Sequence, residues 1–274
     1  MNAVITLARK EVREAVNSTW LIAYAVLFTL LALGLSYLGE RNLGSVGFEN
    51  FSRTTASLLN LCLLLAPLAA LTLGSGAIAG DRERGTLTYL LSQPLDRWEL
   101  LIGKYLGLAA SIALATTLGF GVAGVVIALQ TSAMDLGTYL LFLALVLALI
   151  VVMTGIGLAL SVVSKSRVQA LGLAMLVWFV VAFVFDLVLI GMVSATSMHG
   201  GGLLAALLLN PIEIVRVLAI IQLEPDLQIL GPFGSYLLER VGRTNATVIL
   251  SAALLMWMAL PVTVAAWLFE SRED

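Results

Sequence analysis

The stretch DRERGTLTYLLSQPLDRWE, residues 81–99, decides how the rest of the chain is arranged. It is the densest patch of charge in an apolar sequence, and it lies between two long apolar runs. Within it, Leu87, Leu90 and Leu91 follow the i, i+3, i+4 spacing of one helix face. The stretch therefore predicts a short amphipathic helix that joins two membrane spans.

Both ends of this short helix are marked in the sequence. Gly85 stands just before it, and Pro94 ends it because proline cannot continue the backbone hydrogen-bond ladder. Asp96 and Glu99 then form an Asp-x-x-Glu capping box, which predicts the start of the next helix. A short helix with such sharply defined neighbours is typical of a docking platform rather than of an active site.

The composition places the chain in the membrane. Of its 274 residues, 60% are hydrophobic and 12% are charged, and the mean hydropathy is +1.03. Soluble domains carry about 25% charged residues, so we expect a single all-α integral membrane domain over residues 1–274. Because Cys62 is the only cysteine, one chain can hold neither a disulfide framework nor a thiolate metal cluster.

The N-terminal segment, residues 1–18, is too charged to cross a membrane. It carries Arg9, Lys10, Arg13 and Glu14 on one side, which predicts a helix lying along the cytoplasmic membrane surface. The apolar residues of the other side are Val4, Ile5, Ala8, Val12, Ala15 and Val16.

Six membrane spans are expected, each long enough to supply the roughly 20 apolar residues that a spanning helix needs. They cover approximately 19–38, 56–79, 96–129, 138–163, 169–193 and 246–268, with a cytoplasmic loop at 80–98. Two glycine pairs, Gly76 with Gly80 and Gly103 with Gly107, form small-xxx-small patterns that permit close helix approach.

The segment 194–245 before the last span is either a re-entrant helical pair or a seventh crossing. The number of Lys and Arg residues on each side of the membrane does not distinguish the re-entrant pair from the seventh crossing. A single crossing would place four residues unsuited to the bilayer core near its middle, where each charge costs about 2.5–3.5 kcal/mol. We therefore expect a re-entrant, outward-facing segment and six spans; the four residues are Asn210, Pro211, Glu213 and Arg216.

Catalytic motifs are missing from the chain. It has no Gly-x-Ser-x-Gly elbow, and before Gly103-Lys104 it has Trp98 where a phosphate-binding loop requires glycine. We expect a non-catalytic subunit, and an intramembrane enzyme is the least favoured interpretation.

The only histidine, His199, is read first as a solvated loop residue. An alternative is a soft-metal site, because the thioethers of Met192 and Met198 and an imidazole suit copper(I).

Asp186 is the one acid clearly inside an expected span. Intramembrane acids are functional candidates, which leaves open an ion channel or proton-coupled carrier that works without an ATPase. A hydrogen-bonded structural acid is an equal alternative. Glu213 and Arg216, at i and i+3, are expected to pair with each other on one helix face.

The residues also resemble a known family, the type-2 ABC exporter permeases. The resemblance rests on ERGTL (83–87), LLSQPL (90–95), and then Arg97, Glu99 and Lys104. It implies an interfacial N-terminal helix, six spans, a re-entrant pair, and a coupling helix that docks on a separate ATPase subunit. The residues it assigns to docking are Glu83, Arg84, Gly85, Thr86, Leu87, Leu90, Leu91, Pro94 and Arg97.

Two stretches, 80–107 and LLLNPIEIVR (207–216), narrow this resemblance. They are similar to permeases that serve copper-site maturation of nitrous oxide reductase. This implies a bacterial inner-membrane homodimer with a cytoplasmic N-terminus, a dimeric ATPase that binds ATP and Mg²⁺, and a periplasmic copper-binding partner. The permease itself would bind no cofactor and no nucleic acid, and it would contact membrane lipid. A permease for a lipid, drug or polysaccharide is the alternative.

Overall fold

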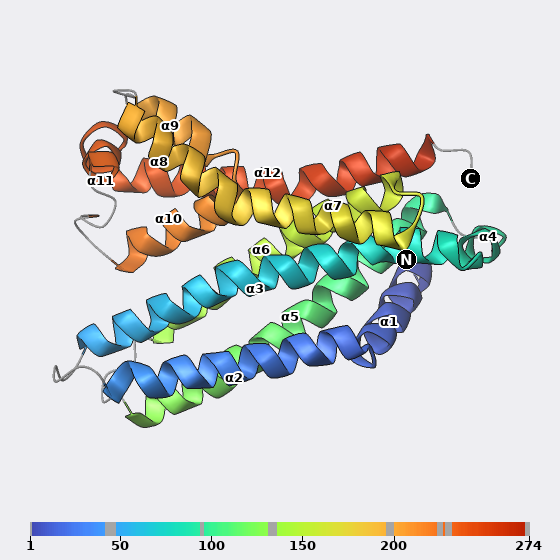
Figure 1. Ribbon diagram of the computed structural model, residues 1–274, viewed down its shortest axis with the longest axis horizontal. Helices are drawn as coiled ribbons and strands as arrows, with labels where there is room; N and C mark the ends of the chain where they lie inside the picture. The colour runs from blue at the N-terminus through green and yellow to red at the C-terminus, as the bar shows by residue number, and fades with distance from the viewer. Residues whose placement is uncertain are drawn as a thin grey trace.

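A computed structural model describes residues 2–41, 48–93, 96–130, 136–195, 200–223, 227 and 232–271. The described elements are all helical, as the sequence predicts (Figure 1). In chain order they are α1 (Asn2–Val16), α2 (Thr19–Arg41), α3 (Phe48–Glu83), α4 (Thr86–Leu91), α5 (Arg97–Gln130), α6 (Leu136–Val163), α7 (Arg167–Phe179), the π-helical η1 (Val180–Val184), α8 (Phe185–Ala195), α9 (Gly200–Leu207), α10 (Pro211–Leu223), α11 (Pro232–Tyr236), the π-helical η3 (Leu237–Val241) and α12 (Arg243–Glu270).

Helix α6 lies at the centre of the bundle and packs against α3 and α12. Its crossing with α3 is close because both helices carry a glycine there. A Cβ added to Gly74 would lie 2.8 Å from the carbonyl oxygen of Thr154, and one added to Gly157 would lie 2.7 Å from that of Leu71. The absence of these two side chains therefore lets the two backbones meet.

The spacing of Gly76 and Gly80 permits close helix approach, but among the described residues no helix backbone meets α3 there. A Cβ on Gly76 would meet only the Nε of Arg167, at 3.7 Å, and one on Gly80 would meet the Cδ of the same arginine at 3.8 Å. These are ordinary contacts with a side chain. The close crossing of α3 with α6 is made at Gly74, two residues before Gly76.

Helix α1 bends away from α2 by 66° and packs along α5, as an interfacial helix should. The buried stripe differs from the one expected. Ile5 and Val16 are exposed, whereas Leu7, Glu11 and Ala15, spaced four residues apart, are buried. The reason is that this stripe, and not the most apolar one, lies on the glycine-lined face of α5.

The small-xxx-small pattern of α5 is the docking seam for α1, as close approach predicts. A Cβ on Gly103 would lie 2.6 Å from the Cβ of Leu7, and one on Gly107 would lie 2.5 Å from the Cβ of Glu11. Both distances are shorter than packed carbon atoms tolerate. The pair of glycines thus fixes where α1 lies.

Helices α9 and α10 form a pair with a bend of 117° between them, which is compatible with the expected re-entrant segment. Side chains satisfy the backbone at the break. Trp257 Nε1 donates to the carbonyl oxygen of Leu208 at 3.0 Å, and Asn210 Nδ2 donates to that of Val181 at 2.8 Å. Asn210 Oδ1 also accepts from the backbone N–H of Ile212 at the start of α10. Irregular backbone at membrane depth is tolerated where protein covers it in this way.

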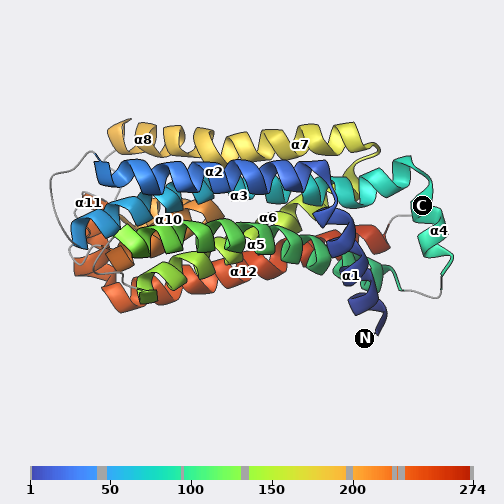
Figure 2. The same cartoon turned by 90° about the horizontal axis from the view of Figure 1, so that it is seen from below.

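The bundle has two distinct ends (Figures 1 and 2). Both termini, α1 and α4 lie at one end, whereas α9 and α11 lie at the other. Termini at one end require an even number of crossings. Five long helices are apolar enough to span. With α2 counted as a span and the α9–α10 pair as re-entrant, the described chain crosses six times.

Candidate functional site

The connection from α3 to α4 depends on Gly85. This residue precedes α4 with φ of +73°, a left-handed conformation that glycine adopts without strain. Helix α4 then runs for six residues and ends at Ser92, as the leucine spacing predicts. Pro94, the expected helix terminator, lies outside the described residues. The result is a short helix beyond the ends of α3 and α5 (Figure 1).

The leucine face of α4 holds the helix to its own bundle. Leu87 is only 3% exposed and packs in a cluster with Ile78 and Leu100, and Leu90 and Leu91 are half-buried against the same cluster. The prediction that Leu87 contacts an ATPase is therefore wrong, because the bundle core already covers it. The exposed face of α4 instead presents Tyr89, which is 69% exposed.

The other predicted docking residues divide into two groups. Glu83, Arg84, Gly85 and Thr86 are exposed at the turn into α4. Arg97 contacts Phe269 of α12 instead. Its Nη1 donates to the carbonyl oxygen of Phe269 at 2.9 Å, and its guanidinium lies 5.7 Å from the centre of the Phe269 ring. Arg97 thus fastens the start of α5 to the end of α12.

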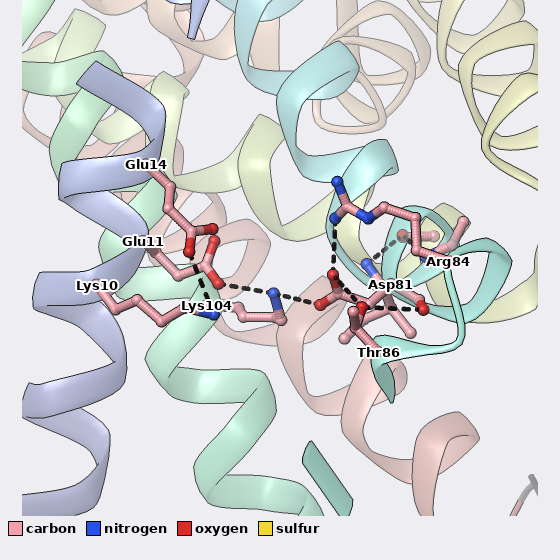
Figure 3. A network of polar contacts seen from close by, with 10 residues as sticks. Lys10, Glu11, Glu14, Asp81, Arg84, Thr86 and Lys104 are labelled. Atoms are coloured by element: carbon pink, nitrogen blue, oxygen red, sulfur yellow. Dashed lines mark hydrogen bonds and ion pairs between the residues drawn. The ribbon is translucent and has the colours of Figure 1, made fainter. Parts of the chain in front are cut away.

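A buried ion network lies where α3 ends and α4 begins (Figure 3). Lys104 Nζ of α5 lies 2.7 Å from Glu11 Oε1 of α1 and 2.7 Å from Asp81 Oδ2 of α3, and all three side chains are less than 10% exposed. The other oxygen of Asp81 accepts from Arg84 at 2.8 Å and from the hydroxyl of Thr86 at 3.2 Å. One carboxylate therefore connects α3, the start of α4, α5 and, through Lys104, α1.

The C-terminal end of α3 is also tied to the turn between α6 and α7. Arg82 Nη1 donates to the carbonyl oxygen of Ser164 at 2.8 Å, and the carboxylate of Glu83 accepts from the backbone N–H of Arg167 at 2.8 Å. The expected capping box is present in part, since Glu99 Oε2 accepts from the backbone N–H of Asp96 at 3.4 Å. These contacts join the end of α3 to the α6–α7 turn and mark the start of α5.

At the opposite end, a second ion cluster joins α8 to α10. Arg216 pairs with Glu213, which confirms the expected local pair, and its Nη1 also lies 3.1 Å from Asp186 Oδ2. Asp186 is therefore not an isolated intramembrane acid. Its salt bridge spans 30 residues of sequence, so helical spacing could not have revealed it.

The soft-metal hypothesis rests on residues outside the described part. Met198 and His199 fall in an undescribed stretch, and the side chain of Met192 is likewise undescribed. Among the described residues, no group of three or more His, Cys, Asp and Glu side chains could hold a metal ion. The metal hypothesis thus stays a prediction.

Comparison with known proteins decides the family. The family model described as "ABC-2 family transporter protein" matches residues 5–274. The chain belongs to the ABC-2 transporter family. It is 38% identical over 224 residues to the protein named "Probable ABC transporter permease protein NosY" of Stutzerimonas stutzeri, and equally to its namesake of Pseudomonas aeruginosa. These matches cover 80% of this chain and 81% and 82% of the two relatives.

Family membership makes the chain a multi-pass ABC transporter permease. It also implies a separate ATPase partner and dimerisation. The sequence analysis did not single out Glu11, a functional residue at this end that lies at the border of the apolar side of the helical wheel, next to Val4 and Ala15. A signal was present nonetheless: Glu11 continues the four-residue spacing of Leu7 and Ala15, facing the glycines of α5.

Proposed function

We propose that this chain is the membrane subunit of an ABC transporter that couples ATP hydrolysis to copper-site maturation of nitrous oxide reductase. The observation that carries the proposal is the 38% identity over 80% of the chain to two NosY permeases. ATP and Mg²⁺ bind to the partner ATPase, and the permease is non-catalytic. The end that carries α4 faces the cytoplasm, and the re-entrant end faces the periplasm.

The ATPase docks on the exposed side of α4. On α4 this surface presents Tyr89, 69% exposed, and the turn before it carries the exposed charges of Glu83 and Arg84; Trp98, 44% exposed, follows at the start of α5. Aromatic and arginine side chains dominate protein–protein interfaces because they bury large areas with few rotatable bonds. Leu90 and Leu91 support the helix from behind.

Movement of α4 reaches the spans through covalent and ionic connections. Helix α4 is joined directly to the ends of α3 and α5, and Lys104 connects both to α1. A short buried ion network resists separation of these helices, because each carboxylate would be left uncompensated in a low-dielectric site. The α4 end therefore moves as one body.

The output of this movement is at the re-entrant end. A periplasmic copper-binding partner engages the segment around α9–α11, and the complex handles copper either by passing it across or by reshaping that partner. Nucleotide can drive such a change only if the two conformations bind nucleotide and partner differently. Met192, Met198 and His199 are the candidate copper contacts of this chain.

A second copy of the permease covers the α8 half of span five. Only 6% of the most apolar part of this span is buried, against 56% for α3, and Leu187 is 69% exposed. The Asp186 side chain, 34% exposed, lies on this span. A charge facing lipid is costly, so contact with a partner subunit stabilises the Asp186–Arg216 pair.

Deletion in the host organism tests the proposal. Cells lacking this chain are expected to make nitrous oxide reductase that is depleted of copper, and a plasmid copy is expected to restore the metal content. Affinity-tagged permease should bring down an ABC ATPase from the same membranes. A fully copper-loaded reductase in the deletion strain would contradict the copper assignment and favour an exporter of another cargo.

A further inference from the structure

A cavity of about 410 Å³ opens at the α4 end, between α1, α2, α3, α5 and α7. Its volume is in the range of ligand-binding pockets, about 300–1,000 Å³. Two small residues of α3, Gly76 and Ala77, are among those that line it and leave room in its wall. The buried Lys104–Asp81 pair forms part of its lining.

The lining at one end of the cavity is ionic and nearly balanced in charge. Arg84 and Arg167 supply positive charge, and Glu14 with Glu11 supplies negative charge. The guanidinium of Arg167 lies over the Gly76–Gly80 face of α3, and within the described chain no carboxylate lies close enough to form an ion pair with it. Arg167 is thus available to an anion that enters the cavity.

The lining at the other end is apolar. Leu171 and Met175 follow Arg167 at i+4 and i+8 on one face of α7. From Arg167 to Met175 this face of α7 lines the cavity for about 12 Å along the helix axis. Leu73 of α3 and Trp20 of α2 face the same space. The indole of Trp20 donates to the hydroxyl of Thr72 at 3.0 Å, which holds the ring in place. Tryptophan is enriched where membrane and water meet.

We infer that this cavity binds one glycerophospholipid with an ammonium-bearing headgroup, of the phosphatidylethanolamine class, from the leaflet at the α4 end. Its phosphate pairs with Arg167 and Arg84, its ammonium group pairs with Glu14, and the beginning of an acyl chain lies along Leu171 and Met175. Three acids and three bases line the cavity, and this balance of charge favours a zwitterion over an anionic headgroup. The apolar wall favours a lipid over free phosphate.

Such a lipid would fill the space between α7 and the α1–α2 elbow. In the described residues α7 packs mainly on α3, and no close packing joins it to α1. A bound headgroup gives α7 ionic contacts to α1 across the cavity. The lipid therefore stabilises the arrangement of the α4 end without touching α4 itself.

Native mass spectrometry of the full-length protein, purified from its own membranes and exchanged into mixed phosphatidylethanolamine and phosphatidylglycerol, tests this inference. The wild type is expected to keep one phosphatidylethanolamine per chain. Arg167→Ala should reduce that occupancy at least tenfold, whereas Lys165→Ala, in the same turn and exposed, should leave it unchanged.

Gly76→Leu provides an independent test, because it fills the cavity from a position with room for a Cβ. It is expected to exclude the lipid while the protein stays folded, judged by an unchanged elution volume. Undiminished lipid in both Arg167→Ala and Gly76→Leu would overturn the inference. Equal retention of phosphatidylglycerol, or release of the lipid by millimolar inorganic phosphate, would also overturn it.

Discussion

Lys104 Nζ lies 2.7 Å from Glu11 Oε1, and this contact joins two buried side chains that are 93 residues apart. The lysine is 4% exposed and the glutamate 8%. Since Asp81 lies at the same distance on the other side, Lys104 is the cation that compensates two buried carboxylates. Lys104 thus holds the interfacial helix α1 on the seam that Gly103 and Gly107 of α5 leave open.

Lys104→Met is expected to destabilise the protein by about 3–5 kcal/mol, because removing one member of a buried pair leaves its partners uncompensated. Thermal unfolding in detergent measures the loss of stability relative to the wild type. Lys10→Met is the matched control, since Lys10 pairs with Glu14 at 3.3 Å on the exposed side of the same α1 helix, with side chains 49% and 59% exposed. Exposed pairs contribute about 0–1 kcal/mol. Equal losses for the two variants would contradict a central role for Lys104.

Gly107→Ala is expected to push α1 off α5. The new Cβ would lie 2.5 Å from the Cβ of Glu11 and 2.7 Å from the backbone oxygen of Ala8, and such overpacking costs about 1–3 kcal/mol. Gly121→Ala in the same helix meets nothing within 4 Å. Replacing a helical glycine there should stabilise by about 0.5–1 kcal/mol. Opposite signs for the two variants in thermal unfolding would support the seam, and a neutral Gly107→Ala would refute it.

Arg216→Met is expected to lower the unfolding temperature more than the fully neutral combination Asp186→Asn, Glu213→Gln, Arg216→Met. The single change leaves Glu213, whose side chain is 9% exposed, beside Asp186 with no cation. The triple change removes all three charges, and neutral replacement of a buried ion cluster is often tolerated. A triple variant less stable than the single one would show that the charges themselves are required.

The sequence predicts the helices of this protein well, because long apolar runs and end signals are local. The capping residue Glu99, the left-handed Gly85 and the break at Asn210 all act within a few positions of themselves. The bend before α10 was also predictable, since Asn210, Pro211, Glu213 and Arg216 would otherwise lie near the bilayer middle, where charge is costly.

Contacts between distant segments were not predictable from spacing. Lys104 finds Glu11 and Asp186 finds Arg216 only after the helices have packed. The leucines of α4 show a related error: their amphipathic spacing identified a buried face correctly, but the chain's own bundle covers Leu87, where a partner protein was expected. A short helix has no local signal that says which apolar surface it will meet.

The measurement that tests the central claim most directly is co-purification of the ATPase with surface variants of the permease. Tyr89→Asp, on the exposed face of α4, is expected to reduce the bound ATPase at least tenfold while the permease remains folded. Trp267→Asp is the control, because Trp267 is similarly exposed, at 68% against 69%, near the same end but on α12. Loss of the ATPase with Tyr89→Asp alone is the predicted result. An intact complex with Tyr89→Asp would contradict docking through α4.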